Sequence, residues 1–217
     1  MIKRVEKITD KITLYNCDCM EYMKDIPDKY FDLCITDPPY GIDACNMTMG
    51  SGTNKKWSKG KKWDNNIPKG EYFDELFRVS KNQIIWGGNY FNLPSKRGWI
   101  FWDKGIDGDC SFADGELAWT SFDVVLRKAN IRYKGFLGMD KERIHPTQKP
   151  VKLYEWLLKN YAKPTDKILD THFGSCSIGI ACHNFGCSLD ACELDEEYFD
   201  NAFKRVRIHV RQLDLFK

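Results

Sequence analysis

The 217-residue chain lacks any apolar run long enough to form a membrane-spanning helix. Its first ten residues, MIKRVEKITD, contain no signal-peptide core, so we expect a cytoplasmic protein with no membrane partner. There is no internal repeat and no low-complexity segment. The formal net charge is only +2, and the chain as a whole is therefore not an obvious polyanion binder.

CxxC spacing is also absent, although the chain contains nine cysteines. This absence argues against a zinc ribbon and against a thioredoxin-like motif. Cys182, His183, Cys187 and Cys192 could instead be grouped around a metal ion. Reduced thiols packed in the core of a cytosolic protein account better for them, and we predict no metal site.

Short β-rich runs alternate with helical stretches, which is typical of an α/β sheet covered by helices on both faces. The length and the 42% hydrophobic composition fit one sizeable domain. Strands are expected at 11–17, 30–36, 82–88, 98–104, 166–170 and 187–194, with an antiparallel hairpin formed by 115–122 and 123–128. Helices are expected at 20–26, 71–80, 151–162, within 171–186 and at 195–210.

The tetrapeptide Asp-Pro-Pro-Tyr at 37–40 ends the apolar run at 30–36. Proline donates no backbone hydrogen bond, fixes its own φ and pushes the preceding residue out of helical geometry. Asp37 and Pro38 should therefore be extended and rigid, with a carboxylate and a carbonyl oxygen facing the space beyond the sheet. The segment is either a stiff turn or a reactive site.

Acidic residues follow several of the predicted strands, at the end where open α/β sheets bind their ligands. Asp37, Asp170 and Glu193 take such positions, and Asp18 is a fourth candidate. One such acid can simply cap a helix. However, Asp170 and Glu193 flank a strand–loop–helix–strand unit, with the spacing at which nucleotide-binding folds place a ribose ligand. The loop, DTHFGSCSIG, lacks the phosphate-binding patterns, so an adenosine ligand without phosphates, such as S-adenosylmethionine, fits better.

Three motifs in chain order resemble the β group of DNA amino-methyltransferases: DPPY (37–40), HPTQKP (145–150) and ILDTHFGSCSIGIAC (168–182). The resemblance covers nearly the whole chain. It implies a Rossmann-like, S-adenosylmethionine-dependent methyltransferase sheet over residues 1–217, mostly parallel with an antiparallel hairpin and with helices on both faces. It also implies a site-specific DNA methylase, similar to small phage or prophage enzymes, that flips an adenine out of DNA and methylates its N6 amine.

The resemblance implies a role for each matching residue. Asp18 would lie near the cofactor adenine, Glu193 would bind the ribose hydroxyls, and the segment around Gly174 would pass beneath the methionine part. His145, Thr147 and Lys149 would close the pocket around the amino-acid end. The implied cofactor residues are Asp18, Asp37, His145, Thr147, Lys149, Asp170, His172, Phe173, Gly174, Ser175, Cys176 and Glu193.

The implied catalytic residues are Asp37, Pro38, Pro39 and Tyr40. An exocyclic amine is a poor nucleophile because its lone pair is delocalised into the ring. If the Asp37 carboxylate and the Pro38 carbonyl each accept one N–H, the lone pair can point at the methyl group, and alignment supplies most of the remaining catalysis. Tyr40 offers a stacking face for the extruded base.

The loop departs from the family pattern, which usually reads Asp-Pro-Phe-x-Gly-Ser-Gly. Thr171, His172 and Cys176 replace the proline, the phenylalanine and the second glycine. We expect the Cys176 side chain where the backbone normally approaches the methionine part, which would weaken cofactor binding. A DNA-binding relative with weakened catalysis is therefore one alternative. A thiol nucleophile made of Cys176 and His172 is another. Cytosine-N4 enzymes more often have serine at position 37; Asp37 favours adenine and leaves cytosine-N4 methylation as an alternative.

The segment NKKWSKGKKW (54–63) combines five lysines with two tryptophans. It is either a solvated loop or a DNA-binding loop whose lysines meet phosphates and whose tryptophans meet bases or sugars. The DNA-binding candidates are Lys55, Lys56, Trp57, Lys59, Lys61, Lys62 and Trp63. The irregular segments 41–69 and 104–144 are expected to be target-recognition insertions. A homodimer is one option, and whether a restriction endonuclease accompanies the protein stays open.

Overall fold

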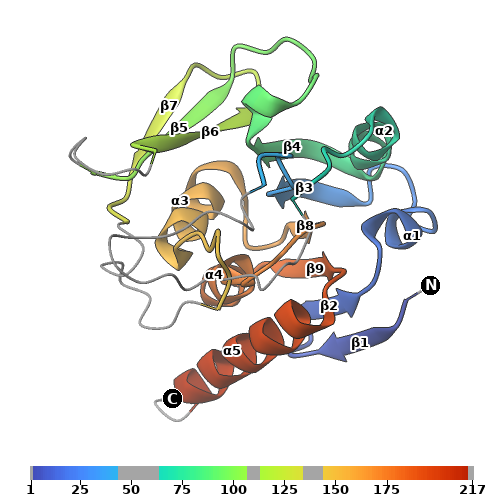
Figure 1. Cartoon of the computed structure of the whole chain (residues 1–217). Coiled ribbons are helices and arrows are strands. Elements are labelled where there is room, and N and C mark those ends of the chain that lie inside the picture. The colour runs from blue at the N-terminus through green and yellow to red at the C-terminus, as the bar shows by residue number, and fades with distance from the viewer. Residues whose placement is uncertain (1, 44–63, 107–112, 134–143, 215–217) are drawn as a thin grey trace.

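The computed structural model describes residues 2–43, 64–106, 113–133 and 144–214. These residues form one sheet with the strand order β1-β2-β9-β8-β3-β4-β6-β5-β7 (Figure 1). The strands are β1 (Arg4–Lys7), β2 (Ile12–Asn16), β3 (Phe31–Thr36), β4 (Ser80–Trp86), β5 (Trp99–Asp103), β6 (Gly115–Thr120), β7 (Arg127–Asn130), β8 (Lys167–Asp170) and β9 (Ser188–Glu193). The helices are α1 (Cys19–Met23), α2 (Gly70–Val79), α3 (Val151–Tyr161), α4 (Ser177–Phe185) and α5 (Glu196–Asp214), with a 3₁₀ turn η2 (Gly88–Tyr90).

The centre of the sheet is parallel. Strands β2, β9, β8, β3 and β4 run in the same direction, in registers such as Leu33 beside Ile168 and Thr36 beside Ile85. The carboxyl ends of these five strands therefore meet at one edge, where an α/β sheet places its ligand. Antiparallel pairs occur toward the two sides, between β1 and β2 and from β4 through β6 to β5. The predicted mostly parallel α/β sheet is confirmed.

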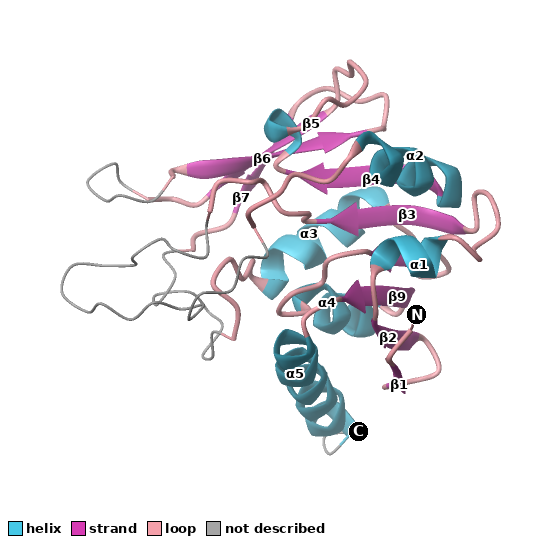
Figure 2. Ribbon diagram, turned by 45° about the vertical axis from the view of Figure 1, so that its right-hand side comes forward, coloured by secondary structure: helices cyan, strands magenta, loops and turns pink. Residues whose placement is uncertain are grey.

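Helices cover both faces of the sheet. Figures 1 and 2 show α1 and α2 on one face and α3, α4 and α5 on the other. The alternation of buried side chains along a strand explains this arrangement, because successive residues point to opposite faces. On β4, Ile84 and Trp86 belong to the core beneath α3 and α4, whereas Ile85 belongs to the core beneath α1 and α2. Ile168 and Leu169 on β8 divide in the same way.

The predicted helices are present, with shifted ends. Helix α3 begins after Pro150, which suits a helix start because proline lacks an N–H that would need a partner there. Helix α5 continues to Asp214, beyond the predicted end at 210. Strand β1 was not predicted: its sequence RVEK is charged and mostly exposed, as suits the edge of the sheet. Among the described residues, no helix combines the length and the apolarity needed to cross a bilayer.

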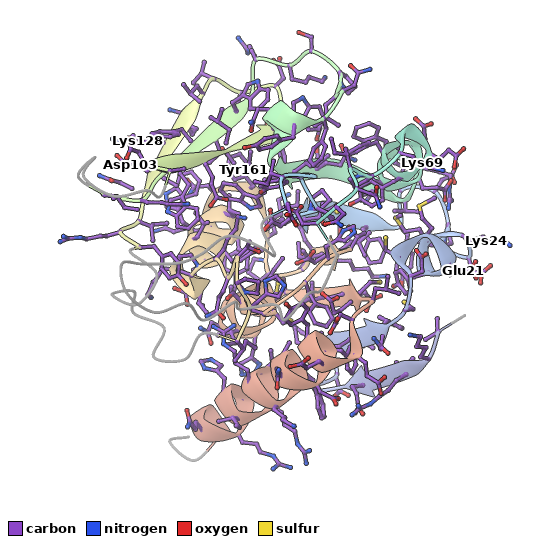
Figure 3. All side chains as sticks on the ribbon, in the orientation of Figure 1. Glu21, Lys24, Lys69, Asp103, Lys128 and Tyr161 are labelled. Carbon is purple, nitrogen blue, oxygen red and sulfur yellow. The ribbon has the colours of Figure 1, made fainter. Side chains whose placement is uncertain are left out.

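The predicted hairpin of 115–122 with 123–128 is wrong. Strand β6 pairs with β4 on one side and with β5 on the other, so it has no free edge for the segment that follows it. Strand β7 instead crosses to the outer side of β5 and pairs with it in parallel. Across these two strands Lys128 Nζ lies 2.8 Å from Asp103 Oδ2, and both side chains project at the margin of the molecule (Figure 3).

Candidate functional site

A cavity of about 720 Å³ opens at the carboxyl ends of the central parallel strands. Most of the predicted cofactor and catalytic residues meet there. Those that line it are Asp18, Asp37, Pro39, His145, Thr147, Lys149, His172, Phe173, Gly174, Ser175 and Glu193. Pro38, Tyr40, Asp170 and Cys176 are not among the residues that line it. The volume falls in the range of small-molecule sites, roughly 300–1,000 Å³.

The loop between β8 and α4 forms one wall of the cavity and is held by Glu193 at the end of β9. Glu193 Oε2 accepts the Gly174 N–H at 3.0 Å, and Glu193 Oε1 accepts the Asp195 N–H at 2.9 Å. Gly174 has a φ of +50°, which a residue without a Cβ adopts readily. Burial raises the pKa of the Glu193 carboxyl to about 7. Each oxygen keeps a further lone pair for a ligand hydroxyl.

Asp18 lines the cavity at the end of β2, the strand beside β9, and also caps a helix. Its Oδ1 accepts the Met20 N–H at 2.8 Å at the start of α1. The capping role that one such acid often has is therefore present. The exposed carboxylate also borders the cavity, and its contact with the cofactor stays a prediction.

Thr171, where the family usually has proline, is a buried hydrogen-bonding centre. Its Oγ1 lies 2.7 Å from Thr36 Oγ1, 2.6 Å from the Tyr72 hydroxyl and 3.0 Å from His172 Nδ1. These contacts join the end of β3 to the start of the loop. Beneath them the buried Asp170 Oδ1 accepts the His172 N–H at 3.0 Å, and burial raises the pKa of Asp170 to about 8. Asp170 thus supports the loop from below.

The Cys176 side chain is buried and does not line the cavity, whereas the sequence-based expectation places it beside the cofactor. Its backbone is left-handed (φ 52°, ψ 38°), and its buried Sγ lies close to Gly179, where an added Cβ would come within 2.7 Å of the sulfur. Burial raises the pKa of the Cys176 thiol to about 12 and lowers the pKa of His172 to about 4. The Cys176 thiol is buried and does not line the cavity, so among the described residues the geometry does not favour a thiol nucleophile with His172 as its base.

The Asp-Pro-Pro-Tyr turn places Asp37 at the cavity and the Tyr40 hydroxyl beside the Asp37 carboxylate. The Tyr40 hydroxyl donates to Asp37 Oδ1, and Lys149 Nζ lies 2.5 Å from Asp37 Oδ2. The Tyr40 ring stacks on Tyr90, with centroids 4.9 Å apart and an interplanar angle of 13°. Asp64 fixes the turn by accepting the Tyr40 N–H at 2.7 Å. Both carboxylate oxygens of Asp37 are therefore held, one by Tyr40 and the other by Lys149.

Several residues of the HPTQKP segment line the cavity. The Thr147 hydroxyl lies 3.2 Å from His145 Nδ1, and the His145 ring packs edge-on against Tyr198 with centroids 4.3 Å apart. Lys149, from the same segment, borders the cavity, but its ammonium group is paired with Asp37 and with Glu116, whose Oε2 is 2.9 Å away. In the part of the chain that is described, no three His, Cys, Asp or Glu side chains are grouped to hold a metal ion.

Comparison with known proteins assigns this geometry to a family. A family model described as DNA methylase (N6_N4_Mtase) matches residues 85–204, which is more than half of the chain. The chain belongs to this DNA methylase family. The type II methyltransferase M.HinfI of Haemophilus influenzae is 26% identical to this methylase over 257 residues, covering 93% of the methylase and 70% of M.HinfI. The type II methyltransferase M.HpaI of Haemophilus parainfluenzae is 23% identical, covering 87% and 72%.

Solved structures show the same fold. The M1.HpyAVI–SAM complex matches with a TM-score of 0.59 and 23% identity, covering 89% of this methylase and 99% of that chain. The PvuII DNA methyltransferase, described as cytosine-N4-specific, matches with a TM-score of 0.58 and 14% identity, covering 92% and 86%. The predicted methyltransferase fold and the predicted DNA methyltransferase class are confirmed.

Several site residues of the methylase were missed from the sequence. Ile67 and Pro68, just before α2, line the cavity, as does Tyr72 in its first turn. Ile67 and Pro68 belong to the segment 41–69, for which the sequence predicts only contact with DNA. Glu116 and Tyr90 were also missed, because each depends on how distant strands and turns are brought together. The predicted DNA-binding residues 55–63 lie outside the residues that the structure describes.

We expect Glu193→Gln to weaken S-adenosylmethionine binding by roughly 1–3 kcal/mol, the scale of losing a charged hydrogen-bond partner. Glutamine has one acceptor oxygen, so it cannot accept from Gly174 and Asp195 and also bind two ligand hydroxyls. Isothermal titration calorimetry measures the dissociation constant. Glu196→Gln, on the exposed first turn of α5, is the matched control and should bind normally. Equal affinity of the two variants would contradict the role of Glu193.

We expect Cys176→Gly to leave cofactor affinity within about threefold of the parent protein, a difference below about 1 kcal/mol. The side chain points into the core, and glycine relieves the left-handed backbone while losing one packed sulfur. Cys176→Ala is the control, because it loses the sulfur but keeps the backbone strain. Calorimetry and chemical unfolding of both variants separate the two effects, and a tenfold loss of affinity in either would place the thiol at the cofactor after all.

Proposed function

We propose that this DNA methylase transfers a methyl group from S-adenosylmethionine to the exocyclic N6 amine of adenine in DNA. The observation that carries the proposal is that the Asp37 end of β3 and the Gly174–Glu193 end of β8 and β9 open into one cavity. An acceptor for an amine and a set of groups suited to an adenosine ligand thus share one space at the carboxyl edge of the sheet.

The residues present fit S-adenosylmethionine. Glu193 offers a carboxylate for the ribose hydroxyls, and apolar side chains such as Ile67, Phe173 and Leu194 line the cavity beside it. When bound, the cofactor supplies a methyl group already activated on a sulfonium. We assign the predicted cofactor residues that border the cavity to direct contact, and Asp170 and Cys176 to support of the loop.

The work left to the protein is alignment of the amine. A carboxylate has about four lone-pair sites, and Asp37 uses two of them for Tyr40 and Lys149. The remaining sites can accept an amine N–H while the Pro38 carbonyl accepts the other, which leaves the nitrogen lone pair free for the methyl carbon. The Pro38–Pro39 pair keeps both acceptors from moving.

Tyr40 is the proposed stacking residue for the extruded base. Its ring already stacks on the exposed ring of Tyr90 in a nearly parallel geometry, which supports its ability to accept another flat ring. An amine inside the duplex cannot be reached, so extrusion of the base must precede transfer. We further propose that segments 41–69 and 104–144 contact DNA, with the lysines of 54–63 on phosphates. A homodimer and a restriction endonuclease partner are further options.

Adenine rather than cytosine is proposed because position 37 is an aspartate. Cytosine-N4 methylation is the second candidate, since the PvuII DNA methyltransferase, whose fold is similar, is described as cytosine-N4-specific. Both bases present an exocyclic amine of the kind that this acid can orient, so the distinction needs a direct measurement.

The test is to express the protein in a methylation-free host, digest the DNA to nucleosides and measure methylated bases by mass spectrometry. N6-methyladenine is the expected product, and long-read sequencing of the same DNA would give its recognition site. N4-methylcytosine would overturn the adenine assignment. Absence of both, together with calorimetric failure to bind S-adenosylmethionine with DNA present, would favour the non-catalytic DNA-binding alternative.

A further inference from the structure

Four side chains of alternating charge lead away from the proposed catalytic acid. Lys149 Nζ lies 2.5 Å from Asp37 Oδ2 and 2.9 Å from Glu116 Oε2, and Lys104 Nζ lies 2.7 Å from Glu116 Oε1. The four come from the end of β3, the segment before α3, strand β6 and the residue after β5. They therefore meet only because β6 lies between β4 and β5 in the folded sheet.

Lys149 is the most enclosed member of this chain of charges. Its side chain is only 3% exposed, and its ammonium group sits 5.2 Å from the centroid of the buried Trp86 ring. A buried ammonium is costly unless it is paired, and here it has two carboxylates and an aromatic face. The single ammonium group of Lys149 is thus shared between the carboxylates of Asp37 and Glu116.

We propose that Lys149 and Glu116 are positioning residues for Asp37. Lys149 keeps the Asp37 carboxylate ionised and oriented. Glu116 also forms an ion pair with Lys149 and so weakens the interaction between Lys149 and Asp37. The inference rests on the proposed function, because Asp37 is taken there as the acid that receives the amine N–H. Under this proposal Lys149 lowers the pKa of Asp37, whereas Glu116 raises it.

The charge balance around Asp37 makes it the more readily protonated of the two acids. Burial raises the pKa of Asp37, and its single ammonium partner, Lys149, only partly opposes this. Burial acts in the same direction on Glu116, but the ammonium groups of Lys149 and Lys104 outweigh it and lower the pKa of Glu116 to about 2. Two carboxylates likewise raise the pKa of Lys149 despite its burial.

The other titratable groups that face Asp37 do not supply the same control. Tyr40, on the same turn, donates its hydroxyl, and burial raises its pKa, so it stays neutral. Tyr154 on α3 is also neutral, since burial raises its pKa well above the ordinary value. Asp170 at the end of β8 interacts with Asp37 as a like charge, but burial raises its own pKa to about 8 and keeps it largely protonated at neutral pH. The charged groups that act on Asp37 at neutral pH are therefore mainly Lys149 and Glu116.

The test compares the pH dependence of kcat/KM for DNA in Lys149→Met and Glu116→Gln. Activity that requires ionised Asp37 falls as the pH drops through the Asp37 pKa of the free enzyme. Removing the ammonium should move this acid limb upward by roughly 1–3 pH units, the usual effect of one opposite charge at contact distance. Removing the competing carboxylate should move it downward by about one unit. Lys149→Arg, which keeps the charge, should retain a limb close to that of the parent protein.

A second measurement does not depend on activity. Carboxyl ¹³C NMR follows the titration of Asp37 itself, assigned from the signal that disappears in Asp37→Asn, in the parent protein and both variants. Glu116→Gln preserves shape and charge pairing between Lys149 and Asp37, so it stays informative if Lys149→Met does not fold. Lys81→Met is the matched control, since Lys81 pairs with Asp32 at 2.7 Å at the far end of β4 and should shift nothing.

Opposite shifts of the Asp37 titration in the two variants support the inference. Shifts in the same direction, or a titration that Glu116→Gln leaves unchanged, would overturn it. If the parent protein methylates no DNA, the proposed function fails, while the NMR titrations still decide whether Lys149 and Glu116 control Asp37.

Discussion

Asp37→Ala is expected to lower the rate of methyl transfer to DNA by about 10²–10³-fold, the usual cost of removing one preorganised group that acts on the reacting atoms. Without the carboxylate, one amine N–H loses its acceptor, and the nitrogen lone pair is no longer directed at the methyl carbon. Lys149 would keep Glu116 as its partner at 2.9 Å, so the change does not leave an unpaired buried ammonium. The protein should therefore fold, and the defect should appear in chemistry.

Single-turnover transfer of labelled methyl groups to a DNA substrate measures the chemical step, and calorimetry measures cofactor binding separately. Cofactor affinity should change by less than about tenfold, or 1.4 kcal/mol. The matched control is Asp32→Ala, which removes a carboxylate from the other end of β3 that pairs with exposed Lys81. A rate for Asp37→Ala close to that of the control would show that the acid does not orient the amine.

The parts of the site that could be predicted from the sequence are those built from contiguous segments. The Asp-Pro-Pro-Tyr turn follows an apolar strand directly, and proline fixes its shape without help from the rest of the chain. The unit from Asp170 to Glu193 is likewise local, because a strand, a loop, a helix and a parallel strand in sequence bring its two ends to the same edge of the sheet. Both predictions follow from backbone chemistry that acts over a few residues.

The residues that escaped prediction depend on pairing between distant strands. Glu116 reaches Lys149 only because β6 pairs antiparallel with β4, and the prediction had paired the same segment with 123–128. Tyr90 reaches Tyr40 because the chain turns sharply after β4. A pattern of alternating apolar residues identifies a strand but not its neighbours, so contacts of this kind lie beyond it.

Cys176 shows a different limit. A residue that replaces glycine in a ligand-binding loop suggests a side chain pointing at the ligand, and this was the expectation. The left-handed backbone at this position turns the side chain toward Gly179 and the core instead. The sequence contained one relevant signal, the glycine three residues later, which provides the space for the sulfur. We therefore propose that Cys176 does not obstruct cofactor binding.

Gly87→Ala is expected to lower methyl transfer by about 10²-fold, the cost of misplacing a group near the chemistry by about 1 Å. Gly87 has a φ of +67°, and an added Cβ would lie 2.1 Å from Cε1 of Tyr40. The Tyr40 ring would have to move, and its hydroxyl donates to Asp37 while its face stacks on Tyr90. One methyl group should thus disturb both the stacking face and the orientation of the acid. Stability should also fall, by roughly 1–2 kcal/mol for the left-handed backbone and a further 1–3 kcal/mol for overpacking.

Two other glycines separate these contributions to the Gly87→Ala effect. Gly186 has a φ of +88° with no atom within 4 Å of an added Cβ, so Gly186→Ala measures the backbone strain alone. Gly70 has open space and ordinary φ, so Gly70→Ala should be close to neutral. Urea unfolding of the three variants, with transfer rates measured well below their unfolding temperatures, gives the comparison. If Gly87→Ala matches Gly186→Ala in stability and retains the parent rate, the Tyr40 ring can move without consequence, and its proposed role in holding Asp37 and the base is wrong.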